Sequence, residues 1–160
     1  MLKNNKIKII VVLIILFAVA IGIVVLINNK SKNVKGTLEE IMAKVYSGIP
    51  EEELPKLLEN IEVNKENIEM FLGTNQIKYR EALASETIIG SIAHSVVLVR
   101  LENIEDVELT IEKIENSVNP RKWICVEAES VIVKNKGNLI ILIMSNEEMV
   151  QKLEENFNNL

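Results

Sequence analysis

The feature that most constrains this chain is an uncharged apolar run near its start. Residues 9–27 read IIVVLIILFAVAIGIVVLI and contain no charged side chain. A helix of these 19 residues, at about 1.5 Å per residue, spans roughly the 30 Å hydrocarbon core of a bilayer. Because lipid offers the backbone no hydrogen-bond partners, a single spanning segment must be helical. We therefore predict that residues 9–27 form a transmembrane helix that binds the chain to a membrane.

Basic residues on both sides of this run bear on its orientation. Three lysines and the α-amino group precede it, and three lysines follow it before residue 37. The small excess on the N-terminal side favours a cytoplasmic N-terminus under the positive-inside rule. We expect a single-pass protein of the cell membrane, with a cytoplasmic tail at 1–8, a linker at 28–36 and an extracytoplasmic domain at 37–160.

A cleaved signal peptide is the alternative interpretation of the apolar run. Ala18-Val19-Ala20 has the residue types of a cleavage site. Further apolar or small residues continue to Ile27, however, so cleavage there would leave a hydrophobic stub on the mature chain. We therefore favour an uncleaved signal anchor.

Charge divides unevenly along the chain and excludes several functions. Residues 1–36 carry six lysines and no acid, which leaves 12 Lys+Arg and all 23 Asp+Glu in residues 37–160, a formal charge of −11. A domain this acidic is a poor nucleic-acid binder, because such binding begins with neutralising phosphates. One cysteine and one histidine exclude a disulfide scaffold and a Cys/His metal cluster. We expect no nucleic-acid partner, no metal and no cofactor.

The first third of the acidic domain has helical patterns. Thr37 to Glu40 fits a capping box, in which a side-chain oxygen and a glutamate satisfy free N–H groups at a helix start. Residues 51–60 carry leucines at helical spacing, although Pro55 limits where such a helix can begin. Asn64 is placed to cap a third short helix that stops at Gly73. This third is predicted to be helical.

The remainder mixes strand and helix periods. We predict a strand over residues 77–85, although the same residues also suit a helix, and an interior strand at 95–101. A helix capped by Asn103 and Asp106 and a strand over 123–134 follow. A turn at 135–138 leads to the buried strand 139–144, and Ser145 to Glu148 reads as a second capping box before a final helix. This order predicts an α+β fold: after the transmembrane helix, one small domain with a mainly antiparallel sheet and helices packed on one face of it.

Several of these segments resemble an uncharacterised family. Leu38 to Ile41 opens the domain, Leu72-Gly73 follows the amphipathic helices, and Val131 to Asn138 leads into a strand, Ser145 and an acidic helix. In these features the chain is similar to a domain of unknown function found in membrane-anchored proteins and lipoproteins of low-GC Gram-positive bacteria such as clostridia. The resemblance implies a membrane-tethered cell-envelope protein, and it carries no catalytic residues.

Two groups of residues are candidate sites. Glu127 and Glu129 would share one face of the predicted strand, where paired carboxylates can serve acid/base chemistry or hold a divalent cation. The competing interpretation is a solvent-facing strand surface. Trp123 beside Arg121 and Lys122 has the composition of a ligand or partner contact, although a core anchor at the strand start also explains the tryptophan.

The single histidine and cysteine are weaker candidates. His94 lacks a clear nucleophile and orienting acid in the sequence, so we expect a histidine at a strand edge with no chemical role. Cys125 falls inside the predicted strand and is expected to be a small buried hydrophobe.

Three functions remain open at this point. The first is a non-enzymatic binding module of the cell envelope, with an envelope protein as partner. The second is a domain that senses a small molecule on its sheet, and the third is an enzyme that uses Glu127 and Glu129. We favour the first, because no phosphate-binding loop, nucleophile elbow or zinc-protease motif is present.

Overall fold

The structure, a computed structural model, describes residues 33–160 of the chain. The predicted cytoplasmic tail 1–8, the predicted transmembrane helix 9–27 and residues 28–32 of the predicted linker lie outside the described residues. Among residues 33–160, no helix is both long enough and apolar enough to cross a membrane. These residues form one unit, which begins slightly before the predicted domain 37–160.

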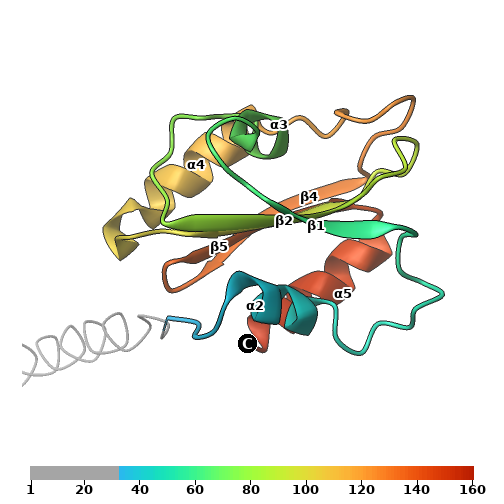
Figure 1. Ribbon diagram of the computed structural model, residues 1–160, viewed down its shortest axis with the longest axis horizontal. Coiled ribbons are helices and arrows are strands. Elements are labelled where there is room, and N and C mark those ends of the chain that lie inside the picture. Colours follow the sequence, from blue (N-terminus) through green and yellow to red (C-terminus); the bar gives the residue numbers. More distant parts are fainter. Residues whose placement is uncertain (1–32) are drawn as a thin grey trace, which may run out of the picture. The chain divides into compact units, whose positions relative to one another are not determined.

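A five-stranded antiparallel sheet is the centre of the fold (Figure 1). Its order is β1-β2-β3-β5-β4, and every neighbouring pair is antiparallel. The prediction of a mainly antiparallel α+β domain is therefore confirmed. The strands are β1 (Leu58–Glu62), β2 (Glu81–Thr87), β3 (Ser95–Arg100), β4 (Ser130–Lys136) and β5 (Leu139–Ser145).

Helices cover both faces of the sheet, so the prediction of helices on one face is wrong. One face is covered by α2 (Leu38–Val45) and α5 (Glu147–Asn158), and the other by α3 (Ile68–Leu72) and α4 (Val107–Ser117) (Figure 1). A short 3-10 turn, η1 (Ile104–Asp106), precedes α4. The reason is visible in β5, whose seven residues are all buried. A strand buried on both faces needs a cover on each.

The helix starts are only partly as predicted. Thr37 and Glu40 form the expected capping box at α2. At α5 the cap is Asn146, whose side chain accepts a hydrogen bond from the Met149 N–H, so the predicted capping box beginning at Ser145 is wrong. Asn64 does not cap α3, which follows Asn67. Asn103 and Asp106 lie at the N-cap positions of η1 and α4, as predicted, but neither side chain makes a capping hydrogen bond. Gly73 ends α3 in the left-handed conformation, as expected.

Two predicted elements are loops. Residues 46–57 form a loop, which includes most of the helix predicted over residues 51–60. The last residues of that predicted helix belong instead to β1, which pairs with β2 along its whole length. Strand pairing has overridden the helical spacing of the leucines there. Residues 118–129 are also a loop, so the strand predicted over 123–134 exists only from Ser130 onward.

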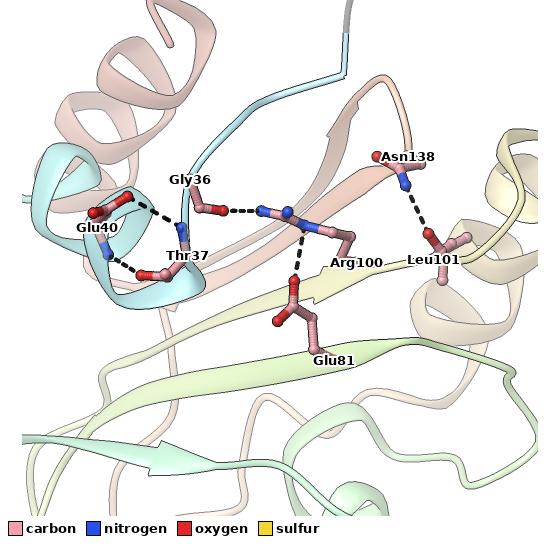
Figure 2. A network of polar contacts seen from close by, with 7 residues as sticks. All are labelled: Gly36, Thr37, Glu40, Glu81, Arg100, Leu101 and Asn138. Carbon is pink, nitrogen blue, oxygen red and sulfur yellow. Dashed lines mark hydrogen bonds and ion pairs between the residues drawn. The ribbon is translucent and has the colours of Figure 1, made fainter.

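At one end of the sheet, which we call the proximal end, the domain holds residues 33–36. Arg100 donates a hydrogen bond from Nη2 to the Gly36 carbonyl at 2.9 Å, and its Nε lies 3.2 Å from Glu81 Oε1 (Figure 2). The Asn138 backbone N–H donates to Asn33 Oδ1 at 3.2 Å. This part of the predicted linker is therefore fixed on the domain.

Candidate functional site

Three long loops meet at the opposite end of the sheet, which we call the distal end. The loops are residues 46–57, 88–94 and 118–129, and they connect α2 to β1, β2 to β3 and α4 to β4 (Figure 1). The strand register places them away from the proximal end, because Glu86 pairs with Ser95 here while Glu81 pairs with Arg100 there. Loops held by a rigid scaffold are where binding residues concentrate.

Backbone strain within the described residues is confined to this end. Leu57 has φ of 56° and Cys125 has φ of 60°, and these are the two non-glycine residues with positive φ in residues 33–160. Left-handed backbone costs an ordinary residue about 1–2 kcal/mol, so it persists only where its surroundings impose it. Such strain gathers at functional sites, and both strained residues lie in distal loops.

Exposed aliphatic side chains cluster at the same place. Leu57, Ile88 and Ile124 are 61%, 58% and 72% exposed. The Ile88 N–H donates to the Leu57 carbonyl at 3.1 Å, and the Ile124 N–H donates to the Gly90 carbonyl at 2.9 Å. These bonds place all three residues within or next to the short run 88–90, and we call Leu57, Ile88 and Ile124 the distal apolar patch. Exposed apolar residues that gather at one place are typical of interaction sites, whereas single scattered ones are not.

An open cleft of about 640 Å³ lies beside this patch. Its apolar lining residues are Leu54, Pro55, Leu57, Leu58 and Ile89, and Glu51 and Lys56 also line it. The segment 51–53 is a run of three exposed glutamates. The cleft is therefore mainly aliphatic, with one acidic and one basic side chain among its lining residues and two more glutamates adjacent in the chain.

A buried ion pair holds the loop that carries Ile124. Lys122 Nζ lies 2.8 Å from Glu86 Oε2, and the two side chains are only 11% and 15% exposed. Trp123 Nε1 donates to the other oxygen of Glu86 at 3.0 Å, and the Ser95 hydroxyl lies 3.3 Å from both charged groups. Lys122 Nζ also lies over the Phe71 ring, 4.9 Å from its centroid. Burial lowers the pKa of Lys122, and the charge of Glu86 opposes that shift.

A second buried polar group lies across the sheet from this ion pair. His94 is fully buried, with Nε2 2.7 Å from the Tyr46 hydroxyl and Nδ1 2.9 Å from Ser145 Oγ. Burial lowers the pKa of His94 to about 4, and burial also raises the pKa of Tyr46. The expectation of a strand-edge histidine is therefore wrong. His94 and Ser145 are inaccessible to solvent, and the group links the C-terminal end of α2 to the start of β3 and the end of β5.

The predicted site residues are only partly brought together. Arg121, Trp123 and Glu127 line one small cleft of about 360 Å³ in loop 118–129, and Arg121 Nε lies 3.1 Å from Glu127 Oε2. Glu129 instead accepts a hydrogen bond from the Glu147 N–H at the start of α5. The predicted pairing of Glu127 and Glu129 on a strand face is therefore wrong, because both precede β4.

Trp123 lies in the loop and not at a strand start, although it packs against the core. Cys125 lines the same small cleft and is exposed, so its predicted burial is wrong. Its positive φ interrupts the extended backbone that a strand would need. Within residues 33–160, no cluster of three or more histidine, cysteine, aspartate or glutamate side chains is arranged to hold a metal ion.

The sequence interpretation missed the ion pair and the apolar patch. Nothing local marks Lys122 as the partner of Glu86, 36 residues away. The signal available for the patch was the pair Ile88-Ile89 beside Gly90, because two large aliphatic residues are unusual in a loop between strands. Comparison of this chain with protein-family models, with curated proteins and with solved structures finds no match. The resemblance drawn from residues 131–138 stays a prediction.

Proposed function

We propose that this chain is a membrane-anchored, extracytoplasmic cell-envelope protein that acts by binding another protein, without catalysis. The observation that carries the proposal is the distal apolar patch: Leu57, Ile88 and Ile124 are more than half exposed at one end of the sheet. The buried Glu86–Lys122 pair supports it, because it fixes the loop that presents Ile124. The apolar run 9–27 and its flanking lysines support the anchor.

The chemistry of the distal end defines the partner. The patch and its cleft offer aliphatic surface. Glu51 and Lys56 line the cleft, Glu52 adds exposed negative charge beside it, and the domain as a whole has a formal charge of −11. Opposite charges steer association, and buried apolar contacts supply affinity. The expected partner is therefore a protein segment that presents aliphatic side chains flanked by lysine or arginine.

Site-specific photo-crosslinking in living cells of the native host tests this surface. A photo-reactive amino acid is placed at Ile88 or Ile124, and as matched controls at Met70 or Leu109, which are 59% and 54% exposed on the helices α3 and α4. We expect one reproducible protein adduct from the distal positions and none of that size from the controls. Equal yields at all four positions, or no adduct at the distal pair, would contradict the proposal.

The single cysteine allows a separate test of location. Cys125 is exposed and is the only cysteine of the chain. A membrane-impermeant maleimide should label it in intact cells, and a Cys125→Ser variant should remain unlabelled. Labelling that requires cell lysis would place the domain in the cytoplasm and refute the proposed orientation.

Small-molecule sensing is a second candidate, favoured by the cleft of about 640 Å³, a size typical of ligand pockets. A metabolite that raises the unfolding temperature of the full chain, and fails to do so after Ile89→Asp, would support this candidate. We do not favour the third candidate, catalysis by Glu127 and Glu129, because Glu127 is paired with Arg121 and Glu129 with the start of α5.

A further inference from the structure

The edge of the sheet formed by β4 offers a second interaction surface. β4 pairs with β5 on one side and is the last strand of the sheet. Its seven residues contain no proline, and its register with β5 is continuous. An edge strand of this kind presents a row of main-chain groups that can pair with another chain.

The hairpin turn indicates which main-chain groups face outward. Lys136 and Leu139 flank a two-residue turn, in which Gly137 has φ of 61°, so they form a hydrogen-bonded pair. Bonded and non-bonded pairs alternate along antiparallel strands. The N–H and C=O groups of Val131, Val133 and Asn135 therefore point away from β5. In residues 33–160 no backbone hydrogen bond from another segment occupies them.

The two lysines that could guard this edge are held elsewhere. Lysine on an edge strand commonly prevents pairing with other chains. Here Lys134 Nζ lies 3.6 Å from Glu154 Oε1 on α5, and Lys136 Nζ donates to the Asn158 carbonyl at 2.8 Å and to the Leu160 carbonyl. Both ammonium groups are therefore paired on the α5 side of β4, and the Lys134 side chain remains 53% exposed.

The opposite edge, β1, is protected in several ways. β1 has only five residues, and the strained backbone of Leu57 precedes it. Glu59 and Glu62 are exposed along it, and the Glu62 carbonyl already accepts a hydrogen bond from Asn67 Nδ2 at 3.0 Å. Short length and charged side chains are devices that prevent edge pairing. Of the two edges, β4 is therefore the one suited to receive a strand.

A groove of about 460 Å³ runs beside β4. Val118 and Pro120, which follow α4, line it together with the β4 residues Val131, Ile132 and Val133, and one acid and one base, Glu115 and Lys134, line it as well. Strand addition uses main-chain hydrogen bonds for affinity and such side pockets for alternate side chains. We propose that the β4 edge binds an extended segment of a partner protein that carries alternating aliphatic residues and a net positive charge. A second copy is disfavoured, because it would bring two domains of charge −11 together.

This inference does not depend on the distal apolar patch, and a peptide titration of the full chain in detergent micelles tests it. The probe is the synthetic peptide KVTVTVK. Hydrogen exchange at the amides of Val131, Val133 and Asn135 should slow about tenfold at saturation, because each gains a hydrogen bond. Exchange at Ile132 and Lys134 should change by less than about twofold, because their N–H groups already face β5.

Two methylated peptides supply the matched control. One carries N-methyl groups on its valines and the other on its threonines, so each blocks the main-chain donors of one edge of the added strand. Only one of the two should retain binding, and Glu115→Lys should weaken the unmodified peptide. Equal binding by both methylated peptides, or unchanged exchange at Val131, Val133 and Asn135 at about 2 mM peptide, would overturn strand addition.

Discussion

Removing the cation of the buried Glu86–Lys122 pair should destabilise the domain and release its distal loop. In Lys122→Met the Glu86 carboxylate keeps the Trp123 and Ser95 donors but loses the ammonium at 2.8 Å. Leaving one partner of a buried pair uncompensated costs about 3–5 kcal/mol. Because the side chains are 11% and 15% exposed, some water reaches them, and we expect about 3 kcal/mol, or roughly 10 °C in Tm.

Removing the anion together with the cation should restore part of the lost stability. In the double variant Glu86→Gln with Lys122→Met no uncompensated charge remains, and the loss should fall to about 1–2 kcal/mol. Urea unfolding of the full chain followed by the fluorescence of Trp123, the only tryptophan, reports directly on this loop. Far-UV circular dichroism monitors the remaining fold as a control. A loss below about 1 kcal/mol for the single variant, or a double variant as damaged as the sum of the singles, would refute the reasoning.

Three further outcomes are expected. The pKa of His94 is lowered to about 4 from an ordinary value near 6.5, so the stability it contributes is present above about pH 6.5 and is lost towards pH 4. About 3 kcal/mol of the acid destabilisation should therefore disappear in His94→Gln, and an unchanged pH profile would count against a buried neutral imidazole. Gly73→Ala places a Cβ 2.0 Å from the Ser117 carbonyl oxygen, at a residue whose φ is +72°. The matched control is Gly48→Ala, where φ is +76° and the space around the added Cβ is open. In chemical unfolding, Gly73→Ala should lower the free energy of unfolding by at least about 2 kcal/mol more than Gly48→Ala does. Leu57→Gly should relieve a left-handed φ without loss of stability yet reduce crosslinking at Ile88, whereas a large fall in Tm would show that the Leu57 side chain supports the fold.

Local sequence patterns predicted much of the scaffold. The capping box at Thr37, the stop at Gly73 and the turn before Leu139 each depend on a few neighbouring residues, and each is present. The apolar runs of β3 and β5 likewise predicted interior strands, because a long apolar stretch must be buried whatever covers it.

The errors occurred where distant contacts compete with local pattern. The segment before Asn60 has helical spacing but pairs with β2, and the alternation around Glu127 is interrupted where Lys122 and Trp123 turn to meet Glu86. Both outcomes depend on residues more than 20 positions away, which no local period contains. The candidate site was found only in part for the same reason: its tryptophan and arginine were noticed, but its organising ion pair was not.

By itself, the sequence determined the α+β class, the antiparallel hairpin, the division of charge and the prediction of a membrane anchor at residues 9–27. These properties follow from composition and short-range periodicity, which depend only on residues close together in the sequence. Only the tertiary structure decided that helices cover both faces of the sheet, that Leu57, Ile88 and Ile124 meet at one end, and that the β4 edge is left open. Those properties depend on which strands pair and which loops meet, and pairing is set by the burial of the whole chain.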